Sequence, residues 1–336
     1  MTRSRDVADT QDNSGGAVPP FLAGKNLIIN GGFDYWQRGT SLSLTSSYAY
    51  LADRFNATVR NGAGTQSRHT LTAAESAICA NLKYAYKFDV TTQATSAKPK
   101  FYQPVEDSWY YYGKTITVSF YAKASKNITL NASADLVWAN ADNYSTDNSF
   151  SLTTTFQRFS YTFTLSPSGT YNSATDTSLA ILFETPLSDT YTVYITGVQA
   201  EFGSVATPFS RAGGTLQGEL AACQRYYYRV SSGNSNNYAV MGISGVQNST
   251  TTGLMFGRNP VTMRAKPTAI EYANLAVNDG SATDPVTSLT INTDRTSDNV
   301  ITCDSGNTAG TLTANRFAYI RGNNSTSAYF GVSAEL

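Results

Sequence analysis

Apolar and polar side chains alternate with a period of two in five segments between residues 25 and 210. Such alternation is typical of β-strands that have one buried and one solvated face. Turn-rich stretches, such as residues 61–64 (NGAG) and 166–169 (SPSG), separate the segments. Strands at this spacing are typical of a β-sandwich or jelly roll, which we expect over residues 25–210. The predicted strands lie at residues 82–90, 116–122, 159–165, 179–183 and 193–195.

Two stretches at the ends of this block resemble each other in pattern. Residues 25–39 (KNLIINGGFDYWQRG) begin with the apolar run 27–29, which predicts a buried strand, and the following Asn-Gly-Gly predicts a sharp turn. Residues 191–203 (YTVYITGVQAEFG) show the alternation again. We expect the two stretches to be the first and last strands of one sandwich and to lie close together. Trp36 follows the turn directly, so we expect it to be structural.

Outside residues 25–210, the sequence patterns are shorter. Residues 211–225 form a connecting segment, in which 216–225 (LQGELAACQR) predicts a short helix. Residues 226–336 again favour strands, and we expect a smaller C-terminal β-sandwich there. Residues 1–24 are too polar to bury a core, so they form either a disordered tail or an extended arm that orders on a partner protein. The predicted fold class is therefore all-β, with a jelly-roll β-sandwich, a connecting helix, a second β domain and an N-terminal arm.

The low and balanced content of charged residues argues against some classes of binding partner. Only 14% of the residues are charged, against roughly 25% in an average domain, and 24 Lys+Arg balance 24 Asp+Glu. This balance gives no electrostatic support to a nucleic-acid or anionic-membrane partner. No apolar run approaches the ~18 residues of a membrane span, so we expect no membrane insertion. The first residues contain no hydrophobic core of a secretory signal, so we expect export by lysis or as part of a particle.

The three cysteines, Cys79, Cys223 and Cys303, lie far apart in the sequence. Their odd number does not suit a disulfide framework, and their spacing does not suit a zinc site. We therefore expect three buried, small apolar side chains.

Scattered blocks of the sequence resemble tailed-phage and prophage virion proteins of a tail-fibre-like or carbohydrate-binding-like kind. The likeness covers nearly the whole chain, with the blocks in the expected order. The blocks are residues 3–9 (RSRDVAD), 24–31 (GKNLIING), 36–40 (WQRGT), 52–55 (ADRF), 197–203 (GVQAEFG), 206–209 (ATPF), 219–227 (ELAACQRYY), 260–268 (PVTMRAKPT) and 333–336 (SAEL).

This resemblance implies a jelly-roll module, a homotrimer, a place in the virion, and an N-terminal segment that attaches to other virion proteins. The candidate attachment residues are Arg3, Arg5, Asp6 and Asp9. The chain is also similar to a wider set of carbohydrate-binding jelly rolls that hold a structural calcium ion.

In those modules an acidic residue follows the Asn-Gly turn, and Asp34 matches that position. Their last strand usually supplies a second Asp, but Thr196-Gly197 stands here. Calcium requires about six to eight oxygen ligands. We therefore assign no metal ligands and no cofactor, and calcium stays open as an alternative.

Residues for catalysis are sparse. A Ser-His-Asp triad would have to use the single histidine, His69, and no Gly-x-Ser-x-Gly motif is present. A glycosidase could work with two carboxylates, and Glu106 and Asp107 beside Trp109 are the best local pair. Adjacent strand residues point to opposite faces, however. We expect no catalytic residues and no enzyme activity.

Aromatic residues among amides offer a different chemistry. Rings can take the apolar face of a sugar, while amides and carboxylates take its hydroxyls. Two segments, residues 106–112 (EDSWYYY) and 135–144 (DLVWANADNY), have this character. In the alternative reading, their tryptophans pack in the core or in a subunit interface. The candidate glycan-binding residues are Trp109, Tyr111, Trp138, Asn140 and Tyr144.

These features favour a structural virion fibre protein of a tailed phage, attached by its N-terminus and binding host cell-surface polysaccharide through its β domains. Weak binding at each copy would be strengthened by several copies acting together. One alternative is a capsid or tail decoration protein without a receptor. A less favoured one is a polysaccharide hydrolase.

Overall fold

The computed structural model describes residues 25–111, 113–137, 148–164, 178–233, 235–307 and 310–336. The chain divides into two compact units, residues 1–220 and 221–336. Almost all of its regular structure is β-strand, which confirms the predicted all-β class. Among the described residues, no helix combines the length and the apolar character that crossing a membrane requires.

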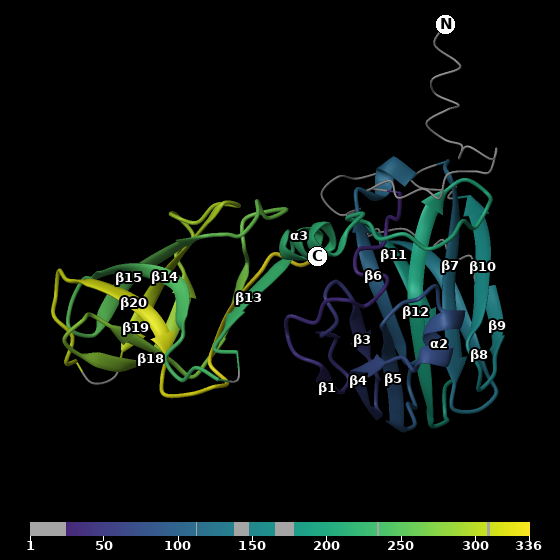
Figure 1. The fold of residues 1–336 in the computed structure, drawn as a ribbon, viewed down its shortest axis with the longest axis horizontal. Coiled ribbons are helices and arrows are strands. Elements are labelled where there is room, and N and C mark those ends of the chain that lie inside the picture. Colours follow the sequence, from purple (N-terminus) through teal and green to yellow (C-terminus); the bar gives the residue numbers. More distant parts are fainter. Residues whose placement is uncertain (1–24, 112, 138–147, 165–177, 234, 308–309) are drawn as a thin grey trace, which may run out of the picture. The chain divides into compact units, whose positions relative to one another are not determined.

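The first unit is a sandwich of two six-stranded antiparallel sheets (Figure 1). The first sheet has the order β1 (Ser41–Leu44), β4 (Ala63–Thr70), β5 (Tyr84–Thr92), β12 (Tyr191–Phe202), β7 (Thr115–Ala124), β10 (Gln157–Thr164). The second sheet has the order β2 (Ala49–Tyr50), β3 (Asn56–Thr58), β6 (Lys100–Glu106), β11 (Ser178–Glu184), β8 (Ile128–Val137), β9 (Asn148–Leu152). Strands distant in sequence are thus neighbours in both sheets.

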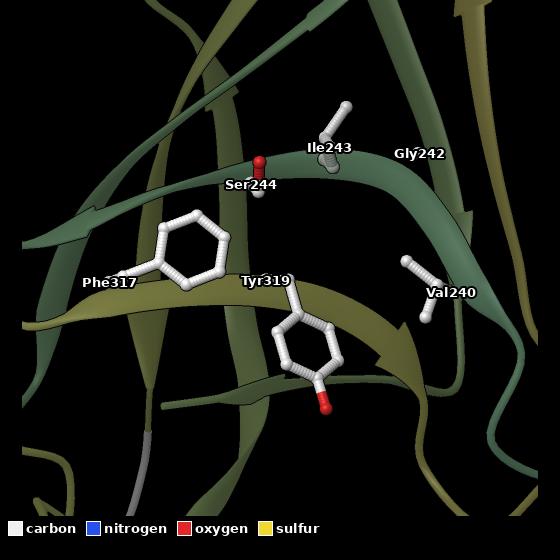
Figure 2. Close-up of a pocket in the computed structure, with 6 residues that line it drawn as sticks. All are labelled: Val240, Gly242, Ile243, Ser244, Phe317 and Tyr319. Atoms are coloured by element: carbon white, nitrogen blue, oxygen red, sulfur yellow. The ribbon is translucent and has the colours of Figure 1, made fainter. Parts of the chain in front are cut away.

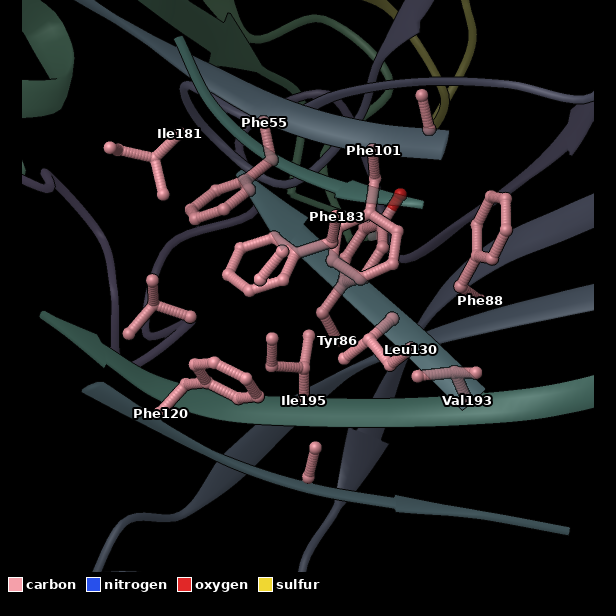
Figure 3. Close-up of a cluster of buried hydrophobic side chains, with 14 of the residues drawn as sticks. Phe55, Tyr86, Phe88, Phe101, Phe120, Leu130, Ile181, Phe183, Val193 and Ile195 are labelled. Carbon is pink, nitrogen blue, oxygen red and sulfur yellow. The ribbon is translucent and has the colours of Figure 1, made fainter. Parts of the chain in front are cut away.

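Aromatic rings fill the space between the sheets (Figure 3). Phe101 lies 5.2 Å from Phe183, and Phe183 lies 5.1 Å from Phe120, measured between ring centroids. Tyr86 is also fully buried, and its hydroxyl donates to Gln66 Oε1 at 2.9 Å. Burial of each large apolar side chain stabilises the fold by about 1.5–3 kcal/mol. The apolar positions of the alternating pattern therefore correspond to the side chains of this core.

The five predicted strands correspond to β5, β7, β10, β11 and β12. The prediction of a strand at residues 27–29 was wrong, because these residues form turns and bends rather than a ladder. The segment nevertheless lies beside β12, since Leu27 N donates to Ala200 O at 2.8 Å. Side chains replace the missing ladder, as described below.

Helices are few among the described residues. The predicted helix is present as α3 (Leu216–Gln224), and a one-turn 3₁₀ helix, η1 (Ser108–Tyr111), follows β6. A second helix, α2 (Ala73–Ile78), was not predicted. It begins with a capping box, in which Thr72 Oγ1 accepts from Glu75 N and Glu75 Oε2 accepts from Thr72 N. This T-x-x-E spacing was a usable sequence signal.

The second unit is also all-β, but it is not a sandwich. Its strands β14 (Val240–Gln247), β15 (Thr252–Arg258), β19 (Val300–Asn307), β18 (Thr283–Ile291), β17 (Leu275–Asn278) and β20 (Phe317–Gly322) close into a barrel in this order. A separate sheet has the order β13 (Tyr227–Ser231), β21 (Tyr329–Ser333), β16 (Ala269–Ala273). The expected C-terminal sandwich is thus corrected to a barrel, since β14 pairs with both β15 and β20 and no edge remains.

Candidate functional site

The glycan-binding residues predicted from sequence fall largely outside the described structure. Trp138, Asn140 and Tyr144 lie outside the described residues, as does the side chain of Trp109. The ring of Tyr111 is 7% exposed and stacks on Phe202 with 6.1 Å between ring centroids. Tyr111 is therefore a packing residue of the first unit, whereas the neighbouring Tyr110 is 51% exposed.

The residues considered for other chemistry have ordinary surroundings. Glu106 ends β6, and Asp107 follows it in a turn with a φ of 59°. His69 lies edge-on to Tyr194, with 4.8 Å between ring centroids, and its Nε2 is 3.5 Å from Glu75 Oε2. The three cysteines are buried thiols, as predicted. The attachment residues Arg3, Arg5, Asp6 and Asp9 lie outside the described residues.

The buried side chain of Asn26 gives the opening motif a structural role. Its side chain is 2% exposed and makes four hydrogen bonds. Nδ2 donates to Val198 O at 3.1 Å and to Ser210 O at 3.0 Å. Oδ1 accepts from Ile28 N at 2.9 Å and from Ala200 N at 3.0 Å. One amide therefore ties the opening segment to β12 and to the chain that follows it.

Two further amides complete this connection. Gln103, on β6, accepts from Ile29 N at 2.8 Å and donates to Ile29 O at 2.7 Å, as a neighbouring strand would. Asn30 adopts a φ of 61°, and its side chain accepts from Tyr35 N at 3.0 Å and donates to Asp53 O at 3.1 Å. The Lys-Asn-Leu-Ile-Ile-Asn-Gly motif therefore supplies hydrogen bonds that close the fold of the first unit.

Asp34, the acidic residue expected at a calcium site, binds the guanidinium of Arg211. Arg211 Nε donates to Asp34 Oδ2 at 2.7 Å, and Nη2 donates to Asp34 Oδ1 at 3.2 Å. Glu219, the other nearby carboxylate, is buried and accepts from Asn30 N and Gly213 N. Burial raises the pKa of Glu219, which disfavours its charged form. Both oxygens of Asp34 are thus engaged, and the residues here do not fit a calcium ion with six to eight oxygen ligands.

The outer face of the second sheet carries a row of aligned side chains. Asn56 on β3 pairs with Tyr102 on β6, Tyr102 pairs with Leu182 on β11, and Leu182 pairs with Ser133 on β8. Leu182 and Ser133 are buried, and Tyr102 is half-buried. Tyr48 adds an exposed ring to one end of this row, at 5.7 Å from the Tyr102 ring and perpendicular to it. We call Tyr48, Asn56 and Tyr102 the tyrosine–amide corner.

The corner contains an unpaired polar atom. Asn56 is 7% exposed, and its Nδ2 donates to the Tyr102 hydroxyl at 3.4 Å. Asn56 Oδ1 is buried and has no hydrogen-bond partner among the described residues. Exchanging the amide oxygen and nitrogen would leave the nitrogen unpaired instead. A buried polar atom without a partner costs about 1–3 kcal/mol.

Protonation at the corner suits a polar ligand that accepts a hydrogen bond. Burial raises the pKa of Tyr102, so the phenol stays protonated and keeps an O–H to donate. The guanidinium of Arg60 lies over the ring of Tyr48, 5.5 Å from its centroid. This cation–π contact therefore stabilises both side chains at the edge of the corner. The corner offers an exposed ring and a phenol hydroxyl within one small area.

A concave feature lies on the barrel of the other unit. A groove of about 390 Å³ is lined by residues of β14 and β20 (Figure 2): Val240, Gly242, Ile243, Ser244, Phe317 and Tyr319. The pairing of β14 with β20 shifts register between Val240 and Ser244, and Gly242 there has a φ of 75°. The bulge bends β14 away from β20 and so opens the groove. We call this feature the barrel groove.

Sequence reasoning missed both features for different reasons. The corner is assembled from β3, β6 and the loop before β2, and no local motif unites its residues. The barrel groove had a weak signal, because the outward residues of β20 include Phe317 and Tyr319 while the inward residues Ala318 and Ile320 are apolar too. A strand that is apolar on both faces predicts that neither face is simply solvated.

No family model and no curated protein matches this sequence. The solved structures similar to part of it include a carbohydrate-binding module of family 4 (CBM4), at 18% identity and a TM-score of 0.35, covering 52% of this chain and 99% of that one. The CBM22-1 xylan-binding domain of Xyn10C from Paenibacillus barcinonensis matches at 12% identity and 0.35, covering 55% and 98%. The enzymatically active domain of tailspike protein 4 from bacteriophage CBA120 matches at 15% and 0.36, over 53% of this chain but only 22% of that one.

Proposed function

We propose that this chain is a non-enzymatic glycan-binding protein and that the tyrosine–amide corner is its contact site in the first unit. The observation that carries the proposal is the exposed ring of Tyr48, set perpendicular to the ring of Tyr102, whose hydroxyl accepts from the Asn56 amide. A sugar presents an apolar ring face and several hydroxyls, which match the Tyr48 ring and the Tyr102 hydroxyl. The Tyr102 hydroxyl supplies a donor for a ring or hydroxyl oxygen.

The corner is small, so its affinity for one sugar residue would be low. Ligand efficiency limits a contact of this size to weak binding unless several copies act together. Multivalent display on a fibre supplies such copies, and a dense host surface supplies the repeated ligand. The proposed mode of action is therefore avidity and not a deep, tight pocket.

We further propose that the chain is a homotrimeric virion fibre protein of a tailed phage that acts outside cells. The sequence blocks described above support this assignment, and Arg3, Arg5, Asp6 and Asp9 are its candidate attachment residues. Deletion of residues 1–24 should then abolish incorporation into particles and leave a folded trimer. Normal incorporation of the shortened chain would contradict the attachment role.

An array of bacterial surface polysaccharides, probed with the purified full chain, tests the glycan-binding function. We expect saturable binding to at least one polysaccharide, without release of soluble product. A complete absence of binding would favour a decoration protein without a receptor. Product release that is lost in Glu106→Gln or Asp107→Asn would instead show a hydrolase.

A further inference from the structure

Several exposed apolar side chains line or flank the barrel groove. Phe317 is 62% exposed and Val240 is 56% exposed, although both line the groove. Phe256 on β15 and Tyr238 before β14 are each 52% exposed. Exposed apolar side chains grouped around a concave surface are typical of binding sites. The groove volume also falls in the range of small-ligand sites, about 300–1,000 Å³.

A cation lies at one end of the same face. Arg321 follows Tyr319 by two residues on β20 and pairs with Val240 of the groove. Its guanidinium lies over the ring of Tyr238, 4.7 Å from the centroid, and Nη2 donates to Thr283 Oγ1 at 2.8 Å. Arg321 Nε is buried and has no hydrogen-bond partner in the described part of the chain. No ion pair of Arg321 is found there either.

Two acidic residues of the barrel, one on β18 and one directly after β17, already have hydrogen-bond partners of their own. Asp284 is fully buried and accepts from Thr311 through N and Oγ1. Asp279 accepts from Ser281, Ala282 and Thr313. Both carboxylates are thus engaged by loops of the barrel. The positive charge of Arg321 is left uncompensated beside an open groove.

We propose that the barrel groove binds a carboxylate-bearing sugar residue, such as a uronic acid within a polysaccharide. Its apolar ring face would lie on Phe317 and Tyr319, and its carboxylate would bind the Arg321 guanidinium. A guanidinium recognises a carboxylate through charge-assisted hydrogen bonds. The hydroxyls of Ser244 and Thr283 flank this path and suit sugar hydroxyls. This site goes beyond the proposed function, because it lies in the other unit and selects for charge.

Binding of an oligogalacturonate and of its methyl ester to the full chain, measured by calorimetry, tests the proposal. The two ligands share the same rings and differ in charge. We expect the acid to bind at least about tenfold more tightly than the ester, and the difference to shrink as salt is raised. Equal affinity for acid and ester would overturn the proposal. Equal binding of a sulfated dextran would also overturn it, by showing a general anion site.

Variants separate the two contacts. Arg321→Gln should abolish the preference for the acid and affect ester binding less than acid binding, whereas Phe317→Ala should weaken the binding of both ligands. Phe317 is exposed, so its truncation should leave the melting temperature unchanged. Val205→Ala, at an exposed residue of the first unit, is the matched control. Tyr48→Ala should not alter acid binding, which distinguishes failure of this proposal from failure of the glycan-binding function. Unchanged acid binding in both Arg321→Gln and Phe317→Ala would contradict the site.

Discussion

The backbone amide of Leu27 donates a hydrogen bond to the carbonyl oxygen of Ala200 at 2.8 Å. Val198 N donates to Gly31 O at 2.9 Å, so the contact extends along the segment. The approach is so close that a Cβ on Gly31 would lie 1.9 Å from Val198 O. The predicted proximity of the two ends of the first unit is therefore confirmed. Backbone hydrogen bonds and buried amides close the sandwich at this point.

Asn26→Ala should destabilise the first unit strongly. The substitution leaves two carbonyls and two amides without their partner in a buried place. We expect the free energy of unfolding to fall by about 3 kcal/mol. Urea denaturation of the full chain measures this loss. Asn127→Ala, at an exposed residue, is the control and should change it by less than about 0.5 kcal/mol. Equal stability of the two variants would contradict the role of Asn26.

Arg211→Ala should lower stability by about 2 kcal/mol, because it removes two charge-assisted hydrogen bonds from the nearly buried Asp34. The guanidinium already satisfies the carboxylate, so calcium should not stabilise the wild type. We expect calcium or a chelator to shift its melting temperature by less than about 1 °C. A rise of several degrees with calcium would show that a metal displaces Arg211.

Acid should weaken the attachment of α2 to the first sheet. Burial alone raises the pKa of Glu75, but hydrogen bonds from Lys123 and Thr72 outweigh it and lower the pKa from 4.5 to about 2. Because the folded-state pKa lies below the unfolded value, this contribution is complete above pH 4.5 and is lost as pH falls towards 2. Unfolding of Glu75→Gln across this range should show a shallower pH dependence, since Gln can still cap α2. An identical pH dependence in the variant would exclude Glu75 as its source.

The sequence predicted five strands of the first unit, because apolar and polar side chains alternate along them. Each inward residue of β7 or β10 is followed by a polar outward one, and this alternation is local. The closing segment was predicted as a strand because residues 27–29 are apolar. The structure shows why they need not be one: Gln103 and Asn26 supply the hydrogen bonds of a ladder from side chains. Such substitution depends on residues far away in the sequence.

The barrel could not be predicted in the same way. Closure depends on the pairing of β14 with β20, and pairing between distant strands leaves no local pattern. The corner has the same origin, because Tyr48, Asn56 and Tyr102 meet only through the register of β3 and β6. The predicted site residues were chosen for local clustering of rings and amides. That criterion cannot distinguish a packed ring such as Tyr111 from an exposed one such as Tyr48.

The polysaccharide array, repeated with Tyr48→Ala and Asn56→Ala, tests the central claim most directly. Leu187→Ala, at another exposed apolar residue of the same unit, is the matched control. We predict that neutral glycans bound by the wild type lose at least about tenfold in affinity with each corner variant, equivalent to about 1.4 kcal/mol, and keep their affinity with the control. Wild-type binding by both folded corner variants would contradict the assignment of the glycan site to the tyrosine–amide corner.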